Sequence, residues 1–288
     1  MRRWVLAFLT MGFLCAQDTR VVLLGTGNPN PQPDRMGPAV AVITGSRAYI
    51  VDCGPGVVRR AVQAGIRSQD LNRLFITHLH SDHTLGYPDF IFTPGVMGRT
   101  EPLQVYGPKG TRAMTRHIQQ AWKEDLDIRL RGGEPSHAEA YVVQVKEFKA
   151  GEIYKDDYVR VVAFPVSHGK WKEAYAFRFE TQDKVIVISG DTRYDERMVE
   201  AAKGADILVH EVFCEEGWKK RKPEWRAYHA AYHTSSSDLA RLAQKIQPKK
   251  LVLYHQLLMG CTPETLLAEL RAGYGGQIVD GKDLDVIR

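Results

Sequence analysis

Short apolar segments separated by turn-forming residues recur along the chain from Val21 onwards. Segments of this kind, rich in Val, Ile, Leu and aromatic residues and bounded by Gly, Pro, Asn or Asp, are typical of β-strands. The pattern predicts strands at 21–24, 39–44, 48–51, 74–77, 103–107, 140–148, 158–166, 175–180, 184–189, 207–210 and 251–254.

Amphipathic segments between these strands predict helices at 57–64, 111–125, about 195–203 and 235–246, with a last helix opening at Thr262-Pro263. For the predicted helix over 235–246, Ser236 or Ser237 and Asp238 are the expected capping residues. Residues 87–98 predict a loop or a broken helix. Over 127–137 the pattern of apolar and polar positions becomes irregular. Two successive sets of strands interleaved with helices favour a layered α/β fold. No linker divides residues 17–288, which we interpret as a single domain.

The first sixteen residues differ from the rest of the chain. Arg2 and Arg3 precede an apolar run over 4–15, and the small Ala16 follows. This layout predicts a secretory signal peptide over 1–16, because the run is short for a transmembrane span. An uncleaved anchor or a misassigned start codon are the alternatives. The expected mature protein is periplasmic or secreted and has no stable membrane association.

Composition adds few constraints. The 288 residues are 44% hydrophobic and 25% charged, which is ordinary for a soluble globular protein. The formal net charge of +5 permits acidic substrates without requiring nucleic acid. Beyond the signal segment, Cys53, Cys214 and Cys261 are odd in number and widely spaced. They predict small buried side chains rather than a disulfide framework.

The richest chemistry lies in the stretch FITHLHSDHTLG at 75–86. It places His78, His80, Asp82 and His83 directly after a strand, and imidazole and carboxylate ligands suit zinc, or less well manganese or iron. In an extended segment residues two apart share a face, so the first three can converge. A turn into a helix at His83 would let adjacent residues address two metals.

Three more metal-competent side chains follow short apolar strands: His168, Asp191 and His255. The ends of strands are where α/β proteins usually build their sites. Together with the first cluster these residues make seven candidate ligands, which is enough for two metals with room for a shared water.

The motifs LGTGNPNP, IVDCGPG, ITHLHSDHTLG, LQVYGPKG, ISGDTR, LVHEVF and HTSSSDLARLA occur in this order. They resemble the metallo-β-lactamase fold superfamily, and within it the ribonuclease Z-like and arylsulfatase-like branch. The resemblance implies a four-layer αββα sandwich with a dinuclear site that usually holds two Zn²⁺, with Mn²⁺ or Fe²⁺ as alternatives. It assigns His78, His80 and His168 to one metal and Asp82, His83 and His255 to the other. Asp191 would bridge the two.

Two cations can activate a bridging hydroxide that attacks an ester, and Asp82 is a candidate to orient or deprotonate it. The resemblance further implies that Glu211 and His233 pair to protonate the leaving group, and His229 is the competing candidate. A carboxylate behind the imidazole is expected to raise the pKa of that imidazole.

The expected activity is hydrolysis of a small anionic ester, most favourably a phosphodiester. An arylsulfatase, a ribonuclease Z-type tRNA 3′ endonuclease, and a β-lactamase or non-catalytic relative are the alternatives. Only 22 residues separate His168 from Asp191, which leaves no room for the substrate arm of bacterial ribonuclease Z. That absence and the signal segment count against tRNA.

Nucleic acid nevertheless stays a candidate partner because basic and aromatic residues interleave over 218–226. A solvated loop or lid is the favoured interpretation of that stretch. A homodimer is also compatible with the sequence.

Overall fold

The computed structural model describes residues 18–288 and contains two seven-stranded sheets. In spatial order the first sheet comprises β14 (Val286–Ile287), β1 (Arg20–Gly25), β2 (Ala39–Thr44), β3 (Arg47–Val51), β4 (Arg73–Phe75), β5 (Leu103–Gly107) and β6 (Val143–Glu147). The second comprises β13 (Ile278–Asp280), β12 (Lys250–Leu257), β11 (Ile207–Phe213), β10 (Val185–Ile188), β9 (Tyr175–Thr181), β8 (Val159–Pro165) and β7 (Gly151–Lys155).

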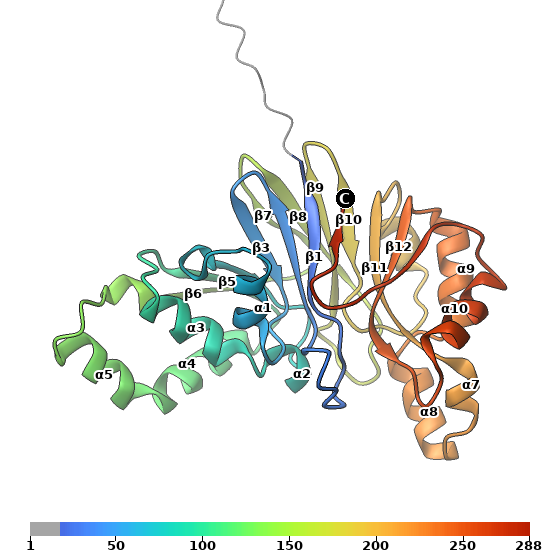
Figure 1. Cartoon of the computed structure of the whole chain (residues 1–288), viewed down its shortest axis with the longest axis horizontal. Coiled ribbons are helices and arrows are strands. Elements are labelled where there is room, and N and C mark those ends of the chain that lie inside the picture. Colours follow the sequence, from blue (N-terminus) through green and yellow to red (C-terminus); the bar gives the residue numbers. More distant parts are fainter. Residues whose placement is uncertain (1–17) are drawn as a thin grey trace, which may run out of the picture.

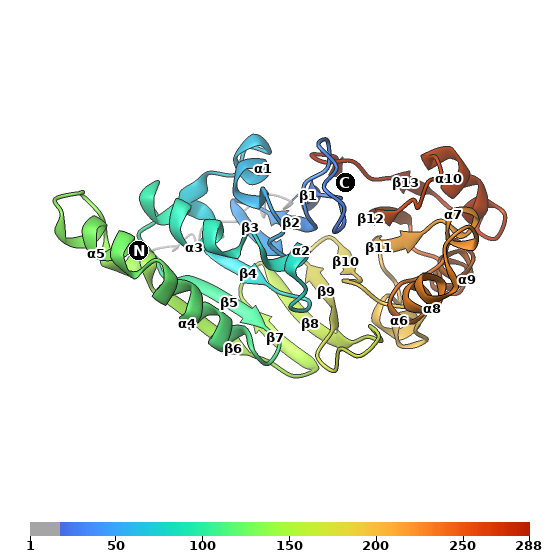
Figure 2. The ribbon, with the colours of Figure 1, turned by 90° about the horizontal axis from the view of Figure 1, so that it is seen from below.

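The helices flank the two sheets on their outer sides (Figures 1 and 2). Beside the first sheet lie α1 (Val57–Gln63), α2 (Ser81–Thr84), α3 (Tyr87–Val96), α4 (Thr111–Ala121) and α5 (Lys123–Arg131), with the short 3-10 turns η1 (Ser68–Asp70) and η2 (Ala138–Tyr141). Beside the second lie α6 (Arg197–Ala201), α7 (Glu215–Lys219), α8 (Pro223–Tyr232), α9 (Ser236–Ile246) and α10 (Pro263–Arg271).

Strand β1 shows why the layers form. Its side chains alternate between the two faces of the sheet. Val21 and Leu23 pack between the sheets, whereas Val22 and Leu24 pack against the α1 and α3 side. A third apolar cluster joins the outer face of the second sheet to α6, α9 and α10. The predicted αββα sandwich is therefore confirmed, with one apolar layer between the sheets and one on each outer side.

Several predicted boundaries are wrong. Residues 87–96 of the predicted loop or broken helix form the continuous helix α3 with Pro94 inside it, and the predicted helix over 111–125 divides at Trp122. Helix α5 also occupies part of 127–137, and β7 was not anticipated. The predicted strand at 140–148 begins as η2 and is extended only over 143–147.

The stretch over 218–226 was interpreted as a loop or lid, and the structure corrects this. It contributes the end of α7 and the start of α8, which opens with Pro223 in its first turn. Proline is favoured there because its missing N–H has no helical partner to lose. Trp218, Lys219, Trp225 and Arg226 therefore stand on helices, whereas residues 220–222 form the turn between the two helices.

The interpretation of the cysteines is also wrong in part. Cys214 and Cys261, 47 residues apart, form a disulfide, and among the cysteines of residues 18–288 Cys53 is left as a free buried thiol. The pairing follows from topology: β11 and β12 are parallel neighbours, so the segments that leave their carboxyl ends start side by side. Sequence spacing carried no sign of this proximity.

The predicted signal peptide over 1–16 lies outside the described residues. Within 18–288, no helix has the length and apolar character needed to cross a membrane.

Candidate metal centre

The predicted ligands meet at one edge of the sandwich, where α2 lies between the ends of the two sheets (Figure 2). His78 and His80 follow β4, Asp82 and His83 lie on α2, and the remaining three belong to the second sheet: His168 follows β8, Asp191 follows β10 and His255 is in β12. Strands β10, β11 and β12 are parallel, and β8 runs the same way because it is antiparallel to β9. Their carboxyl ends therefore share one edge.

Three imidazoles and one carboxylate form the first ligand group. Nδ1 of His80 lies 3.0 Å from Nε2 of His78 and 3.0 Å from Nε2 of His168. Oδ2 of Asp191 lies 3.9 Å from both Nε2 atoms. All four ligand atoms fall within 4.8 Å of one another, which is compact enough for one cation.

Asp82, His83 and His255 form the second ligand group. Oδ2 of Asp82 lies 3.2 Å from Nε2 of His255 and 3.6 Å from Nε2 of His83. The two oxygens of Asp191 approach the same imidazoles, with Oδ1 at 3.3 Å from His83 and Oδ2 at 3.4 Å from His255. Asp191 thus stands between the groups. Asp82 does not belong to the group of His78 and His80. Helix α2 begins at Ser81, so the alternation of side chains in the extended segment stops before Asp82.

The local backbone aims His255 at the centre. The register between β11 and β12 shifts at this point: Glu211 faces Tyr254 and Val212 faces Gln256, so His255 is an extra residue. Its φ of 45° is unusual for a non-glycine residue. A β-bulge re-aims a side chain in this way and is frequent beside active sites.

Neighbouring groups fix the histidine tautomers in a state that fits divalent cations. Nδ1 of His83 lies 2.8 Å from Oδ2 of Asp52, and Nδ1 of His168 lies 2.7 Å from the carbonyl oxygen of Tyr232. Each acceptor holds the Nδ1 proton, so the Nε2 lone pair faces the ligand group. Within residues 18–288, Nε2 of His83 and Oδ1 of Asp191 are buried without a hydrogen-bond partner. A cation would satisfy both.

His80 is held differently. The indole N–H of Trp171 donates to Nε2 of His80 at 2.6 Å, and Nδ1 of His80 faces the first group. A neutral ring in this orientation carries its proton on Nδ1, so cation binding at Nδ1 would require the proton to move to Nε2 and the N–H of Trp171 to turn away.

Burial favours neutral imidazoles in the first group. It lowers the pKa of His168 to about 4 and that of His78 well below its usual value. In the second group burial would likewise lower the pKa of His83, but the carboxylates around it, Asp191 first among them, outweigh burial and raise that pKa. A metal-free site therefore holds a compensating positive charge here, which a cation would replace.

Sequence reasoning missed Asp52 as part of the site. Its carboxylate accepts hydrogen bonds from the backbone N–H and the hydroxyl of Thr77 and contacts His83. Asp52 has a φ of 59° at the end of β3. A carboxylate between a strand end and glycines was visible in the sequence, but its partner 31 residues away was not.

Glu211 and His233 come together beside the metal centre. Oε1 of Glu211 lies 3.4 Å from Nδ1 of His233, which is 4.0 Å from Oδ2 of Asp191. The backbone N–H groups of Thr192 and Thr234 donate to the same Glu211 oxygen. His229, one turn earlier on α8, is farther from the ligands: its Nδ1 contacts the carbonyl oxygen of Trp225, and its ring centroid is 6.1 Å from that of His233.

The expected upward shift of the His233 pKa is wrong for this structure. Burial lowers the pKa of His233 to about 4, and burial raises the pKa of Glu211 well above its usual value. Both shifts favour a neutral acid beside a neutral imidazole. The pair holds the same number of protons whether it is neutral or an ion pair, so it keeps one transferable proton and no net charge.

A pocket of about 800 Å³ opens next to His233. The residues that line it come from the loop after β1, from α8 with the turn before it, and from the segment after β12: Asn28, Pro29, Asn30, Gln32, Arg221, Trp225, Tyr228, His229, His233, Leu257, Leu258, Met259, Gly260 and Cys261. This pocket is the natural place for a substrate of the metal centre.

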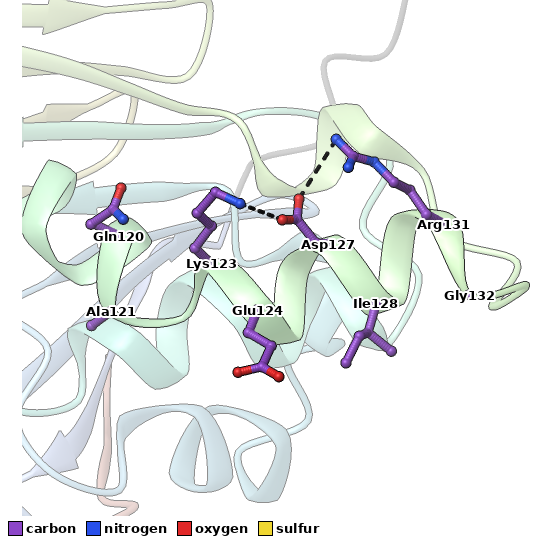
Figure 3. Close-up of a pocket in the computed structure, with 8 residues that line it drawn as sticks. All are labelled: Gln120, Ala121, Lys123, Glu124, Asp127, Ile128, Arg131 and Gly132. Carbon is purple, nitrogen blue, oxygen red and sulfur yellow. Dashed lines mark hydrogen bonds and ion pairs between the residues drawn. The ribbon is translucent and has the colours of Figure 1, made fainter.

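A second hollow lies at the opposite end of the molecule, on α4 and α5 (Figures 1 and 3). Asp127 is one of the residues that line this hollow, and its carboxylate forms ion pairs with Lys123 and Arg131 (Figure 3). None of the candidate ligands lines this hollow, so it has no part in the chemistry of the metal centre.

Comparison with known proteins identifies the family to which this fold belongs. A family model described as a β-lactamase superfamily domain matches residues 47–256, which is more than half of the chain. A ribonuclease Z of Mycobacterium bovis (strain BCG / Pasteur 1173P2) is 32% identical over 273 residues, covering 92% of this chain and 96% of that protein. The chain belongs to the metallo-β-lactamase superfamily. Its resemblance to the ribonuclease Z-like branch is confirmed.

Solved structures of the superfamily agree in fold. The YhfI protein of Bacillus subtilis has a TM-score of 0.74 at 17% identity, with 94% of this chain and 99% of YhfI covered. The short form of human tRNase Z has a TM-score of 0.68 at 22% identity, with 93% and 98% covered. With its two ligand groups, this metallo-β-lactamase superfamily member is a metal-dependent hydrolase that acts on ester bonds.

Proposed function

We propose that this chain is a phosphodiesterase that uses two divalent cations, with zinc as the expected metal. The observation that carries the proposal is the convergence of two ligand groups on Asp191, with the Glu211–His233 pair beside it. Two cations held there would supply a nucleophile at neutral pH and neutralise charge on the attacked ester.

We assign the proton-transfer steps to side chains beside the metals. Asp82 is the member of the second ligand group that can also accept a proton, because a carboxylate has a second oxygen. We assign it to orienting the attacking water. His233 faces the pocket with Glu211 behind it, so the pair can pass its proton to the departing oxygen.

A ribonuclease Z-type endonuclease acting on tRNA is a second candidate, and a specific comparison favours it. The alignment covers 96% of the M. bovis relative. Residues between His168 and Asp191 form β9, β10 and their turns, as the sequence predicted. The chain therefore matches a protein named ribonuclease Z almost end to end without an additional arm, and the argument from the missing arm against tRNA loses its weight.

Metal analysis and a panel of chromogenic esters test the activity. We expect about two metal ions per chain, and cleavage of bis-p-nitrophenyl phosphate that chelation abolishes and zinc restores. Asp191→Asn, which keeps the shape of the bridging side chain, should lose both metal and activity. Cleavage of p-nitrophenyl sulfate alone would favour an arylsulfatase, and cleavage of nitrocefin alone a β-lactamase; either result would overturn the proposal.

A precursor tRNA is the additional substrate that separates the two candidates. Specific cleavage at the tRNA 3′ end would establish the endonuclease. Cleavage of bis-p-nitrophenyl phosphate without any tRNA processing would leave the simple phosphodiesterase.

A further inference from the structure

The pocket beside His233 carries features that the metal centre does not use. Rings follow one side of α8 to the residue that ends it: Trp225 and His229 are four residues apart on the helix, and His233 follows directly after its last residue. Adjacent ring centroids are 5.7 Å and 6.1 Å apart. The ring of His233 stacks in turn at 5.6 Å on His255. A continuous row of rings therefore leads from the pocket mouth to the metal centre.

The outer end of this row is an exposed aromatic surface. The side chain of Trp225 is 52% exposed, and Tyr228 beside it is 38% exposed, with 5.7 Å between the ring centroids. Both line the pocket. Eight residues of helix place Trp225 about 12 Å along the axis from His233, so a group attached to the departing oxygen would extend toward it.

The opposite wall is polar. Asn30 and Gln32 line it on the loop after β1. Oε1 of Gln32 is buried without a hydrogen-bond partner within residues 18–288. A buried carbonyl oxygen of this kind is costly unless a ligand donates to it.

The pocket also contains a positively charged side chain. Arg221 lines it and forms no ion pair within the described part of the chain, whereas the neighbouring Lys219 and Lys220 pair with Glu215 and Glu216 on α7. The pocket thus offers an aromatic face, a hydrogen-bond acceptor and a free guanidinium. That combination suits a planar ring that carries N–H groups and is attached to a phosphate.

We infer that Trp225 is a specificity-determining residue of this site, whose indole stacks on a nucleobase in the leaving group while Gln32 accepts a hydrogen bond from that base. The inference rests on the proposed phosphodiesterase activity. We place the base in the leaving group because His233, the proposed proton donor, would face the departing oxygen. A plain aryl group would also stack on Trp225, but it would leave Oε1 of Gln32 without a donor.

Binding of small probes to the zinc-loaded protein tests this without turnover. Isothermal titration with adenosine 5′-monophosphate, phenyl phosphate and ribose 5-phosphate compares a base, a plain ring and no ring on a phosphate. We expect the nucleotide to bind most tightly. Trp225→Ala should weaken nucleotide binding by about tenfold, the usual scale of base stacking, and Trp225→Phe should restore most of it.

Two further variants complete the design. Trp122→Ala removes a comparably exposed indole, 43% exposed at the junction of α4 and α5, and should leave every affinity unchanged. Gln32→Met should weaken nucleotide binding while sparing phenyl phosphate. Equal affinities for all three probes, or equal effects of the two tryptophan variants, would overturn the inference. Phenyl phosphate binding as tightly as the nucleotide would overturn the assignment to a base.

Failure of the inference and failure of the proposed function can be told apart. Cleavage of bis-p-nitrophenyl phosphate by the unaltered protein reports on the function alone. The ratio of the affinity for adenosine 5′-monophosphate to the affinity for ribose 5-phosphate reports on the pocket, because the contribution of the phosphate cancels in it.

Discussion

At the scale of single residues, the candidate metal centre depends on groups that lie outside the two ligand groups. Asp52 and the carbonyl oxygen of Tyr232 contact Nδ1 of His83 and His168, and so present the opposite nitrogen to the metals. Such partners usually change metal affinity 10- to 100-fold. The seven ligands are therefore only part of what makes this site.

Replacing Asp52 with Asn should weaken metal binding at the second group. Asn tolerates the positive φ at this position, but its amide can present an N–H to the His83 ring and favour the wrong tautomer. We expect affinity for one of two zinc ions to fall about 10- to 100-fold, measured by competition with a chromogenic chelator. Asp70→Asn, at an exposed pair with Arg67, is the control. Unchanged affinity for both ions would show that Asp52 does not set the tautomer.

Replacing His233 with Ala should expose its role as proton donor. Turnover of phosphodiesters with alkyl leaving groups should fall about 10²- to 10⁴-fold, while p-nitrophenyl esters, whose leaving group needs no proton, should be nearly unaffected. Steady-state rates on the two ester types measure this. His117→Ala, which removes an exposed histidine of α4 that does not line the pocket, is the control, and His229→Ala tests the competing donor. Equal losses on both esters would contradict the assignment.

At the scale of elements, the segment between β11 and α9 has the greatest effect on the pocket. The turn between α7 and α8 carries Arg221, and α8 carries Trp225 and brings Tyr232 to the first ligand group. The Cys214–Cys261 disulfide joins the start of α7 to the segment after β12, which forms another wall of the same pocket. The disulfide thus ties the segment that leads into the aromatic wall to the wall formed after β12.

Removing this disulfide should destabilise the fold. It closes a segment of 47 residues, and the chain-entropy relation gives a loss of about 4 kcal/mol in the free energy of unfolding for a loop of that length. Urea denaturation of the Cys214→Ser/Cys261→Ser double variant measures it. Dithiothreitol should lower the stability of the unaltered protein but leave the double variant unchanged. A double variant as stable as the parent would refute the expectation.

At the scale of the whole molecule, we propose that the protein is exported. The predicted signal segment supports this, and so does the disulfide, because such bonds persist mainly in oxidising compartments. Export would remove the protein from cytosolic tRNA, so it favours the simpler phosphodiesterase over the endonuclease.

The mature protein should then begin at Gln17. Expression of the full chain in a bacterial host, followed by periplasmic fractionation and mass spectrometry of the N-terminus, measures this. Removal of residues 1–16 would lower the formal net charge from +5 to +3. A cytosolic protein, or an exported one that retains Met1, would contradict the proposal.

The pattern of apolar positions by itself determined a layered α/β class and most strands, because alternating apolar positions must face one layer or the other. The four-layer αββα arrangement came from the resemblance of the motifs to the metallo-β-lactamase superfamily. It also placed each candidate ligand at or just beyond a strand end. Local pattern was a weaker guide where a helix is short or polar, as in α5 and α7, because few apolar positions mark its buried face.

The spacing of the candidate ligands left open which of them share a group. The family resemblance implied the division, and only the tertiary structure shows its reason, which is backbone geometry. Helix α2 turns Asp82 away from His78, and the bulge in β12 points His255 at Asp82. The partner of Asp52 and the pairing of Cys214 with Cys261 likewise depend on which strands lie side by side. Residue identity fixed the chemistry available, and chain topology chose which groups meet.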